Sequence, residues 1–321
     1  MEPLLLILSF VVALVVGRGF VPQSVRAGIT GRDVHKPGQP KIAEMGGLCI
    51  ASGFAAGVLG AVGMLSFLGA FSDVNLAVLL AALAAVLMSA LIGAFDDLLG
   101  IPQGIKAALP ILAAVPLMAV RAGDTRMVVP LVGSVDLWIL YPLLVIPSAV
   151  TVSANAVNML AGFNGLEAGL GIVAMGSLSI IAWQLGETAA LILLLSGLGA
   201  LLAILPLNWY PARVFVGDVG TLSIGAVVAA AVIIGDFEVA GLILLIPYGV
   251  DFVIKAGHRF PKTFGELRSD GKLHCPRSGP KGLGQLLMKM TGGIHERTLV
   301  LLLMGIEAVF GVGAVLLYVL K

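Results

Sequence analysis

The sequence predicts an all-α, polytopic membrane protein of about ten transmembrane helices, which form one domain over residues 1–321. Of the 321 residues, 59% are hydrophobic and only 12% are charged. Apolar runs of roughly 20 residues, the length that crosses a bilayer, recur along the whole chain. A water-soluble domain of this size could not bury so much apolar surface, whereas lipid accepts it directly.

The predicted spans are helices because their apolar runs are long and lack the polar alternation of membrane β-barrel strands. The first run has no basic segment before it and many spans follow it, so we interpret it as a span and not as a signal peptide. A small hairpin is expected over 121–136, and a long cytoplasmic loop over 255–297. The spans are predicted at residues 3–18, 46–71, 75–95, 105–121, 137–157, 166–185, 188–207, 219–234, 238–256 and 298–320.

Lysine and arginine are distributed unequally between the two sets of loops. With the N-terminus outside, the outer side holds only Arg121, Arg126 and Lys321. Basic residues cross membranes reluctantly, so the other, richer set of loops is predicted to be cytoplasmic. The net charge of +1 gives no reason to expect nucleic acid, and the two cysteines indicate neither a disulfide framework nor a zinc site. The inner segments hold Arg18, Arg26, Arg32, Lys36, Lys41, Lys106, Arg213 and the basic run over 255–297.

Two adjacent carboxylates, Asp96 and Asp97, end the third predicted span. Neighbouring carboxylates repel each other and are costly at low dielectric, so the pair favours a bound cation or a proton. An ordinary solvated helix end is the alternative. Lys106, at the start of the fourth span, would either pair with a phosphate or extend its amine to the membrane surface. Asp251 and Glu307 lie within spans and are expected to pack against polar partners.

Three asparagines, Asn155, Asn158 and Asn164, lie where the fifth predicted span leaves the membrane. The first two are three residues apart and can share a helix face. Amides at membrane depth are costly unless they bind something, and Gly162 and Gly165 would let the backbone approach a ligand closely. An Asn/Gly turn without a ligand is the alternative.

Asp218 and Phe215 belong to the segment NWYPARVFVGDVG, which combines amide, cationic, acidic and aromatic side chains. This mixture favours a nucleotide-and-metal pocket over a simple N-cap for the next helix. In the first loop, Glu44 is not explained by a merely basic inner segment. The loop over 255–297 suits either a diphosphate or anionic lipid headgroups. The four histidines have no metal-ligand spacing, so none is predicted to bind a metal.

Glycine-rich segments precede several of the helices that would begin at the cytoplasm. Helix N-termini carry positive dipole ends and free backbone amides, which bind phosphate. Carboxylates at the same face would bind Mg²⁺. This face therefore favours phosphate chemistry. A membrane transporter, the alternative from another class, would not readily account for paired carboxylates and glycine-rich helix starts on one face only.

Five motifs taken together resemble those of the polyprenyl-phosphate N-acetylhexosamine-1-phosphate transferases, the MraY/WecA-like superfamily. They are GRDVHK with Glu44, FDD, NAVNMLAGFNGLEAG, NWYPARVFVGD and CPR. The motifs are most similar to those of the dolichyl-phosphate GlcNAc-1-phosphate transferase branch, in the style of an archaeal enzyme, because no His-rich run of the bacterial kind stands in the last loop. Ser278 and Gly279 replace the His and second Arg of the eukaryotic enzymes.

The resemblance implies a ten-helix membrane fold with a cytoplasmic-face catalytic cleft, in the plasma membrane if the source is prokaryotic. It implies transfer of N-acetylglucosamine-1-phosphate, or a related HexNAc-1-phosphate, from a UDP-sugar to dolichyl or polyprenyl phosphate, with release of UMP. A bacterial-type transferase for cell-envelope precursors remains the alternative. The implied partners are UDP-GlcNAc or a related UDP-sugar, the lipid phosphate and membrane lipids, with no nucleic acid. Assembly as a homodimer is left open.

The resemblance also implies roles for individual residues. Mg²⁺, with Mn²⁺ as the alternative ion, would be bound by Asn158 and Asp218. The catalytic residues would be Asp96, Asp97 and Lys106, and Lys106 would also bind the lipid phosphate. The expected step is direct attack of that phosphate on the β-phosphorus, with Asp97 as a base or covalent nucleophile left open. Contacts with the UDP-sugar would come from Glu44, Asn155, Asn164, Phe215 and Arg277.

Overall fold

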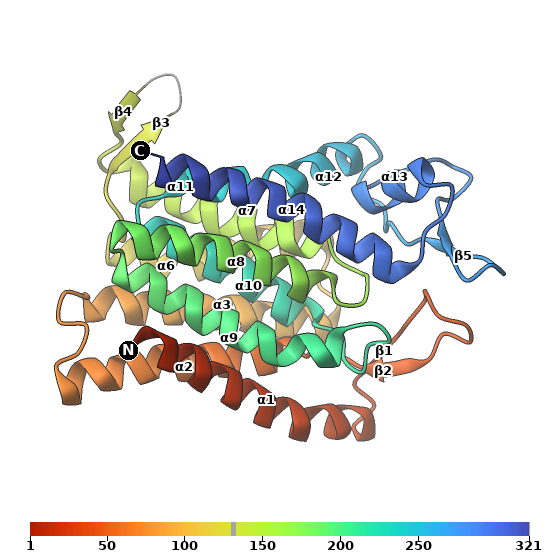
Figure 1. Ribbon diagram of the computed structural model, residues 1–321, viewed down its shortest axis with the longest axis horizontal. Coiled ribbons are helices and arrows are strands. Elements are labelled where there is room, and N and C mark those ends of the chain that lie inside the picture. The colour runs from red at the N-terminus through yellow and green to blue at the C-terminus, as the bar shows by residue number, and fades with distance from the viewer. Residues whose placement is uncertain (130–132, 321) are drawn as a thin grey trace.

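The computed structural model describes residues 1–129 and 133–320 and shows a bundle of long helices (Figure 1). Within these ranges, eight helical segments are long and apolar enough to cross a membrane. Seven of them both begin and end within a few residues of the predicted spans. The eight are α1 (Glu2–Arg26), α2 (Gly47–Leu68), α3 (Leu76–Leu99), η1 with α7 (Tyr141–Val145 and Ile146–Met159), α8 (Leu166–Leu185), α9 (Thr188–Asn208), α10 (Gly217–Ile234) and α14 (Glu296–Val319).

The first helix is longer than predicted, because it continues to Arg26 instead of ending at residue 18. The prediction covered only the apolar run, which ends next to Arg18. A change from apolar to polar side chains marks where a helix leaves the bilayer. It does not end the backbone hydrogen bonding, which continues past Arg18 into the polar layer.

Two predicted spans are not single straight helices. The predicted span 105–121 consists of α4 (Gln103–Ala108), α5 (Pro110–Ala113) and α6 (Val115–Ala119), which break next to Pro110 and Pro116. The predicted span 238–256 consists of α11 (Glu238–Leu244) and α12 (Ile246–Ala256), bent by 52° just before Pro247. Proline lacks an N–H and clashes with the preceding turn, which accounts for each break.

Both broken segments still carry the chain from one end of the bundle to the other. Tyr141 begins the span that follows α6, and its hydroxyl bonds to Glu238 at the start of α11. Both residues lie at the end opposite to that where α3 finishes and α4 begins. By length and composition the described residues hold eight candidate spans, or nine if the bent pair α11 and α12 is one span, against the ten predicted, while Gln103–Ala119 is a shorter apolar stretch.

Short antiparallel strand pairs and one short helix lie outside the bundle. The expected hairpin over 121–136 is present as β3 (Arg126–Val129) and β4 (Gly133–Asp136), and its tip at 130–132 lies outside the described residues. The other elements were not predicted, since strands of two or three residues have no hydrophobic period. These are β1 (Thr30–Arg32) with β2 (Lys41–Ala43), β5 (Glu266–Leu267) with β6 (Leu273–His274), and α13 (Leu283–Met290).

Helix α10 lies at the centre of the bundle. In its most apolar stretch of 18 residues 89% of the residues are buried, against 22% in the corresponding stretch of α1. Its close neighbours approach it through glycines. A Cβ on Gly47 of α2 would lie 2.0 Å from the backbone nitrogen of Gly220, and a Cβ on Gly93 of α3 would lie 2.4 Å from the carbonyl of Asp218. These backbone contacts fix the start of α10 between α2 and α3.

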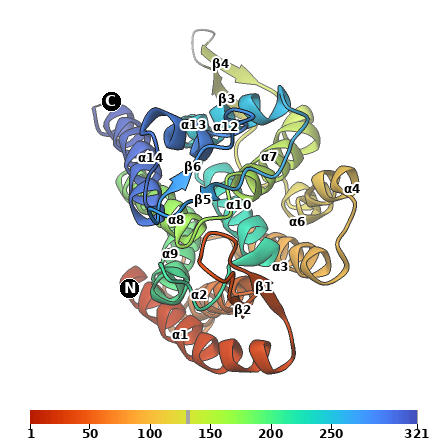
Figure 2. The ribbon, with the colours of Figure 1, turned by 90° about the vertical axis from the view of Figure 1, so that its right-hand side faces the viewer.

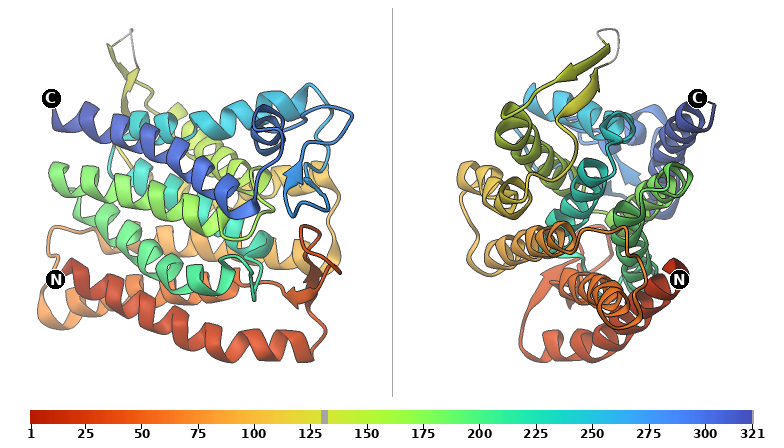
Figure 3. Two further views of the ribbon diagram at one scale, coloured as in Figure 1. Left: turned by 45° about the vertical axis from the view of Figure 1, so that its right-hand side comes forward. Right: turned by 90° about the vertical axis from the view of Figure 1, so that its left-hand side faces the viewer.

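The two ends of the bundle differ in what they carry. Both termini lie at one end, together with β3 and β4 (Figure 1). The strands β1, β2 and β5 and the helix α13 gather at the other end (Figure 3, left). Figure 2 looks onto that second end and shows the start of α10 amid the loops that come from distant parts of the sequence. The site described next lies there.

Candidate active site

A cavity of about 690 Å³ opens at the end of the bundle where α10 begins. Its walls come from the first loop, the ends of α3 and α7, the start of α10 and the segment after α12. The structure therefore brings together residues as far apart in the sequence as Gly31 and Phe264. Of the residues that the sequence marked as candidates, those that line it are Glu44, Asp96, Asp97, Lys106, Asn158, Phe215 and Asp218.

An ionic cluster lines this cavity. The Lys106 ammonium lies 2.6 Å from Asp96 Oδ2 and also donates to Asp218 Oδ2. Asn158 Nδ2 donates to Asp218 Oδ1 at 2.5 Å and to Thr221 Oγ1 at 2.8 Å. Three helix ends and the short helix α4 thus meet around Asp218. Polar side chains from distant parts of the sequence therefore converge on one site.

Asp97 lies beside this cluster but faces the backbone of α10. Its Oδ1 accepts the N–H of Asp218 at 2.9 Å, and its Oδ2 accepts the N–H of Val219 at 3.2 Å. Gly217 has φ +70°, and a Cβ there would lie 2.6 Å from Asp97 Oδ2. Asp97 therefore acts as an N-cap supplied by another helix, and glycine is needed at 217 to let it approach.

The first loop and the α9–α10 connection are joined by backbone hydrogen bonds. Phe215 donates its N–H to the Ala43 carbonyl at 2.8 Å and accepts the N–H of Gly46 at 2.8 Å. Glu44 is thereby held next to Phe215 and lines the cavity. Burial raises the pKa of Glu44, and the nearby Asp218 carboxylate raises it further.

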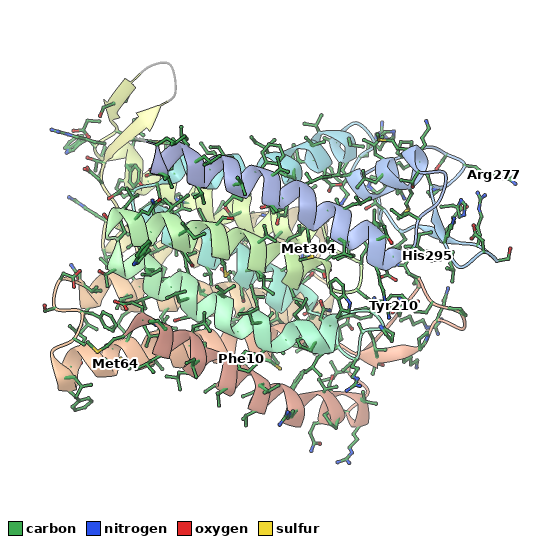
Figure 4. The ribbon with its side chains drawn as sticks, viewed as in Figure 1. Phe10, Met64, Tyr210, Arg277, His295 and Met304 are labelled. Atoms are coloured by element: carbon green, nitrogen blue, oxygen red, sulfur yellow. The ribbon has the colours of Figure 1, made fainter. Side chains whose placement is uncertain are left out.

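Three of the residues predicted to contact the UDP-sugar are not among those that line the cavity. Asn164 is 2% exposed, accepts the N–H of Ala212 at 2.8 Å and donates to Asp33 at 3.1 Å. Asn155 donates to two backbone carbonyls. Arg277 is exposed at the outer edge of the last loop (Figure 4). Their contacts with a substrate stay predictions.

A buried ionic network that the sequence did not reveal joins the loops around the cavity. The Lys36 ammonium lies 3.3 Å from Asp33 and donates to Glu296 at the start of α14. Glu296 also accepts the backbone N–H of Asn164 at 2.7 Å. The Lys36 ammonium is 4.1 Å from the ring centre of Tyr210. No single position signals this network, because its charges are 260 residues apart and only the fold pairs them.

Among the residues that line the cavity without having been predicted as site residues are His35, Glu167 and Lys255. Glu167 accepts the N–H of Gly162 at 2.7 Å. Lys255 lies 2.8 Å from Asp251 and donates to the carbonyl of Met159. The i, i+4 spacing of Asp251 and Lys255 was the signal that could have found this pair, and it supplies the polar partner expected for Asp251.

Glu307 differs from the expectation. It is 0% exposed within α14, and neither carboxyl oxygen has a hydrogen-bond partner among the described residues. It lines a small internal cavity of about 20 Å³ together with Tyr248 and Ser153. The prediction that Glu307 has a polar partner is therefore wrong, since neither oxygen has one by hydrogen bonding in the described part of the chain.

The donor atoms of the ionic cluster suit a hard divalent cation. Mg²⁺ prefers oxygen ligands and is commonly held by one or two carboxylates together with phosphate oxygens of the substrate. Asp218 and the amide of Asn158 supply such oxygens, although Asn158 now presents its N–H to Asp218 and would have to turn its amide over. Within residues 1–129 and 133–320 no group of three or more His, Cys, Asp or Glu is arranged to hold a metal ion. The protein would thus supply few ligands, which leaves positions for a substrate.

Comparison with known proteins places this site in a family. The family model described as glycosyl transferase family 4 matches residues 78–236, the stretch from α3 to α10. A relative from Saccharolobus solfataricus is 36% identical over 316 residues, covering 97% of this chain and 95% of its own length. The chain belongs to glycosyl transferase family 4. The resemblance inferred from the five motifs is thereby confirmed.

Two relatives that cover most of the chain carry the same name, and a relative that matches a shorter stretch carries another. The Saccharolobus protein is named as a putative UDP-N-acetylglucosamine–dolichyl-phosphate N-acetylglucosaminephosphotransferase. A relative of that same name from Dictyostelium discoideum, without the qualifier, is 30% identical and covers 85% of this chain and 78% of its own. A phospho-N-acetylmuramoyl-pentapeptide-transferase from Enterococcus faecalis is 43% identical but covers only 32% of each chain.

Proposed function

We propose that the protein transfers N-acetylglucosamine-1-phosphate from UDP-N-acetylglucosamine to dolichyl phosphate or a related polyprenyl phosphate, releasing UMP. The observation that carries this proposal is the cluster of Asp96, Lys106, Asn158 and Asp218 inside one cavity. The cavity volume of about 690 Å³ lies in the range of small-molecule sites. The relatives that match nearly the whole chain carry the name of this reaction. The muramoyl-type and transporter alternatives lack such support.

The reaction breaks one phosphoanhydride bond and forms another. An oxygen of the lipid phosphate attacks the β-phosphorus of the nucleotide sugar, the bond from that phosphorus to the bridging oxygen breaks, and UMP leaves with the electron pair. Both reactants are anions, so charge neutralisation and positioning account for most of the catalysis. Lys106 lines the cavity, and we propose that its ammonium meets the attacking phosphate.

The contacts of Asp97 support direct attack by the lipid phosphate. A carboxylate that acted as a covalent nucleophile would need a free oxygen, and both oxygens of Asp97 accept N–H groups of α10. We therefore assign Asp97 to positioning Asp218. UMP exchange into UDP-GlcNAc without lipid tests this assignment: we expect no exchange, and exchange as fast as turnover would contradict it.

A Mg²⁺ ion, with Mn²⁺ as the alternative, would be held by Asp218 and Asn158. It would neutralise part of the diphosphate charge. Lys106 would then be released from Asp218 toward the lipid phosphate while it keeps its contact with Asp96. Asp218→Asn is expected to weaken metal binding in a titration with the metal alone.

The cavity is proposed to face the cytoplasm, because lysine and arginine are concentrated in the loops at its end of the bundle. The chain offers a direct test. Of its two cysteines, Cys49 is buried within α2 and Cys275 is partly exposed in the last loop. A membrane-impermeant thiol reagent should label Cys275 in inverted vesicles but not in intact cells. Labelling in intact cells alone would contradict this orientation.

The activity itself is tested with purified protein, UDP-GlcNAc, Mg²⁺ and dolichyl phosphate, with the lipid product identified by mass. We expect UMP release together with a lipid-linked GlcNAc diphosphate. A panel of UDP-sugars, including the UDP-muramoyl-pentapeptide, identifies the preferred sugar. Asp218→Ala should abolish turnover while the protein stays folded. Preference for the muramoyl substrate, or the absence of any UMP release, would contradict the proposal.

A further inference from the structure

A short segment of the last cytoplasmic loop covers one side of the cavity. It consists of residues 260–264, called the strap below, and connects the end of α12 with β5. All five of its residues line the cavity. One of them, Lys262, is a cation, and its side chain is exposed to solvent.

The strap is held in place at its C-terminal end. Gly265 donates its N–H to Nε2 of His35 at 3.1 Å, and the carbonyl of Phe264 accepts the side-chain amide of Gln285 at 2.8 Å. Both anchors are buried, His35 at 3% exposure and Gln285 at 2%. The His35 ring is also stacked on Phe163, with the ring centres 4.9 Å apart. The anchors therefore keep the strap against the cavity.

Cationic side chains in this cavity divide into two kinds. Lys106 and Lys255 are neutralised by carboxylates, at 2.6 Å to Asp96 and 2.8 Å to Asp251 respectively. The side chains of Lys262 and Arg32 form no ion pair or hydrogen bond with any residue in the described part of the chain. The four cations that line the cavity are Arg32, Lys106, Lys255 and Lys262.

An anionic substrate needs unpaired cations in this cavity. Glu44, Asp96, Asp97 and Asp218 all line it, and their carboxylates repel a diphosphate unless positive charge faces it. The strap is anchored to His35, which belongs to the same loop as Glu44 and lines the same cavity. Building on the function proposed above, we infer that Lys262 binds the diphosphate of the nucleotide sugar, and that His35 is the positioning residue that holds the strap over it.

Lys262→Met tests the binding role. Loss of one charged contact to a phosphate is expected to raise the KM for UDP-GlcNAc about tenfold, with kcat and the KM for dolichyl phosphate within about twofold of wild type. Lys289→Met is the matched control, since Lys289 is exposed on α13 and does not line the cavity. A selective rise in the KM for dolichyl phosphate would overturn the inference in favour of the lipid phosphate, and an unchanged KM for both would overturn it outright.

Direct binding separates this inference from the proposed function. In titrations of the purified protein, Lys262→Met should weaken binding of UDP about tenfold but leave binding of uridine, which has no phosphate, unchanged. This binding result does not depend on turnover, so the inference about Lys262 could still be tested if the transfer reaction were not observed. An equal loss for UDP and uridine would overturn a contact with the diphosphate.

The positioning role of His35 has its own readout. His35→Phe keeps a ring against Phe163 but removes the acceptor for Gly265. If His35 acts through Lys262, the double variant His35→Phe with Lys262→Met should bind UDP no more weakly than Lys262→Met alone, because coupled sites are not additive. A loss equal to the product of the two single losses would show that His35 acts independently, and would overturn this part of the inference.

Discussion

Helices α2 and α10 make a very close contact beside the candidate active site, at Gly47 and Gly220. Gly47, the first residue of α2, donates its N–H to the carbonyl of Val216 at 2.8 Å, just before α10. A Cβ at this position would lie 2.0 Å from the nitrogen and 2.4 Å from the Cα of Gly220. Ordinary contacts begin near 3.4 Å, so Gly47→Ala must move α10 by about 1.4 Å, since backbone atoms cannot rotate away.

This displacement reaches the chemistry directly, because Asp218 is two residues before Gly220. A misplacement of about 1 Å in an active site costs roughly a hundredfold in rate. We therefore expect kcat/KM for UMP release by Gly47→Ala to fall on the order of 100-fold, with a lower midpoint in thermal unfolding. Gly63→Ala is the control, since it lies in the same helix and its Cβ would meet nothing within 4 Å. If Gly47→Ala retained the activity and the midpoint of Gly63→Ala, the reasoning would be refuted.

Three other predictions follow from single side chains. Lys106→Met removes the cation between Asp96 and Asp218, so kcat should fall at least about 100-fold; a change confined to the KM for UDP-GlcNAc would count against its role at the lipid phosphate. Burial lowers the pKa of His35 to about 4, partly offset by Asp33, so the folded state binds fewer protons than the unfolded state between pH 6.5 and 4. The free energy of unfolding should therefore decrease by about 3 kcal/mol as the pH falls through this window, and His35→Phe should remove that dependence. The same dependence on pH in the variant would show that His35 is not its source. Glu307→Leu replaces a buried carboxyl without a hydrogen-bond partner, so its unfolding midpoint should equal or exceed that of wild type with activity retained, and a lowered midpoint would show that the carboxyl has a stabilising role.

The membrane fold could be predicted from the sequence because each span is a local property. An apolar run of sufficient length must be a helix in lipid, whatever the other runs do. The breaks in the segments that contain Pro110 and Pro247 were missed because hydropathy does not register a proline among apolar residues. The extension of α1 beyond Arg18 was missed because the hydropathy falls at Arg18, whereas the helix continues to Arg26.

The candidate site could be predicted in part, where the residues carry their own signal. Asp96, Asn158 and Asp218 are polar groups at helix ends, where an apolar chain has little reason to place them. Glu296 gave no such signal, and Lys36, although part of the GRDVHK motif, gave no indication of this partner, since only the fold pairs the two. A pairing across 260 positions is a property of the tertiary structure alone.

His35 was overlooked for a different reason. The histidines were considered only as metal ligands, and their spacing did not fit that role. The structure instead uses the neutral ring of His35 as a hydrogen-bond acceptor for Gly265 and as a stacking partner for Phe163. Neither use requires a spacing motif, so the pattern of histidines along the sequence could not indicate it.

The central claim is that Asp218 and Asn158 hold a divalent ion at the point where the lipid phosphate attacks the nucleotide sugar. Its most direct test is UMP release by the purified enzyme after chelation, followed by titration with Mg²⁺, for the wild type and for Asp218→Asn. We predict that chelation abolishes release, that Mg²⁺ restores it in the wild type, and that Asp218→Asn requires far more Mg²⁺ or is not restored. Full turnover in the chelated wild-type enzyme, or identical titrations for both proteins, would contradict the account.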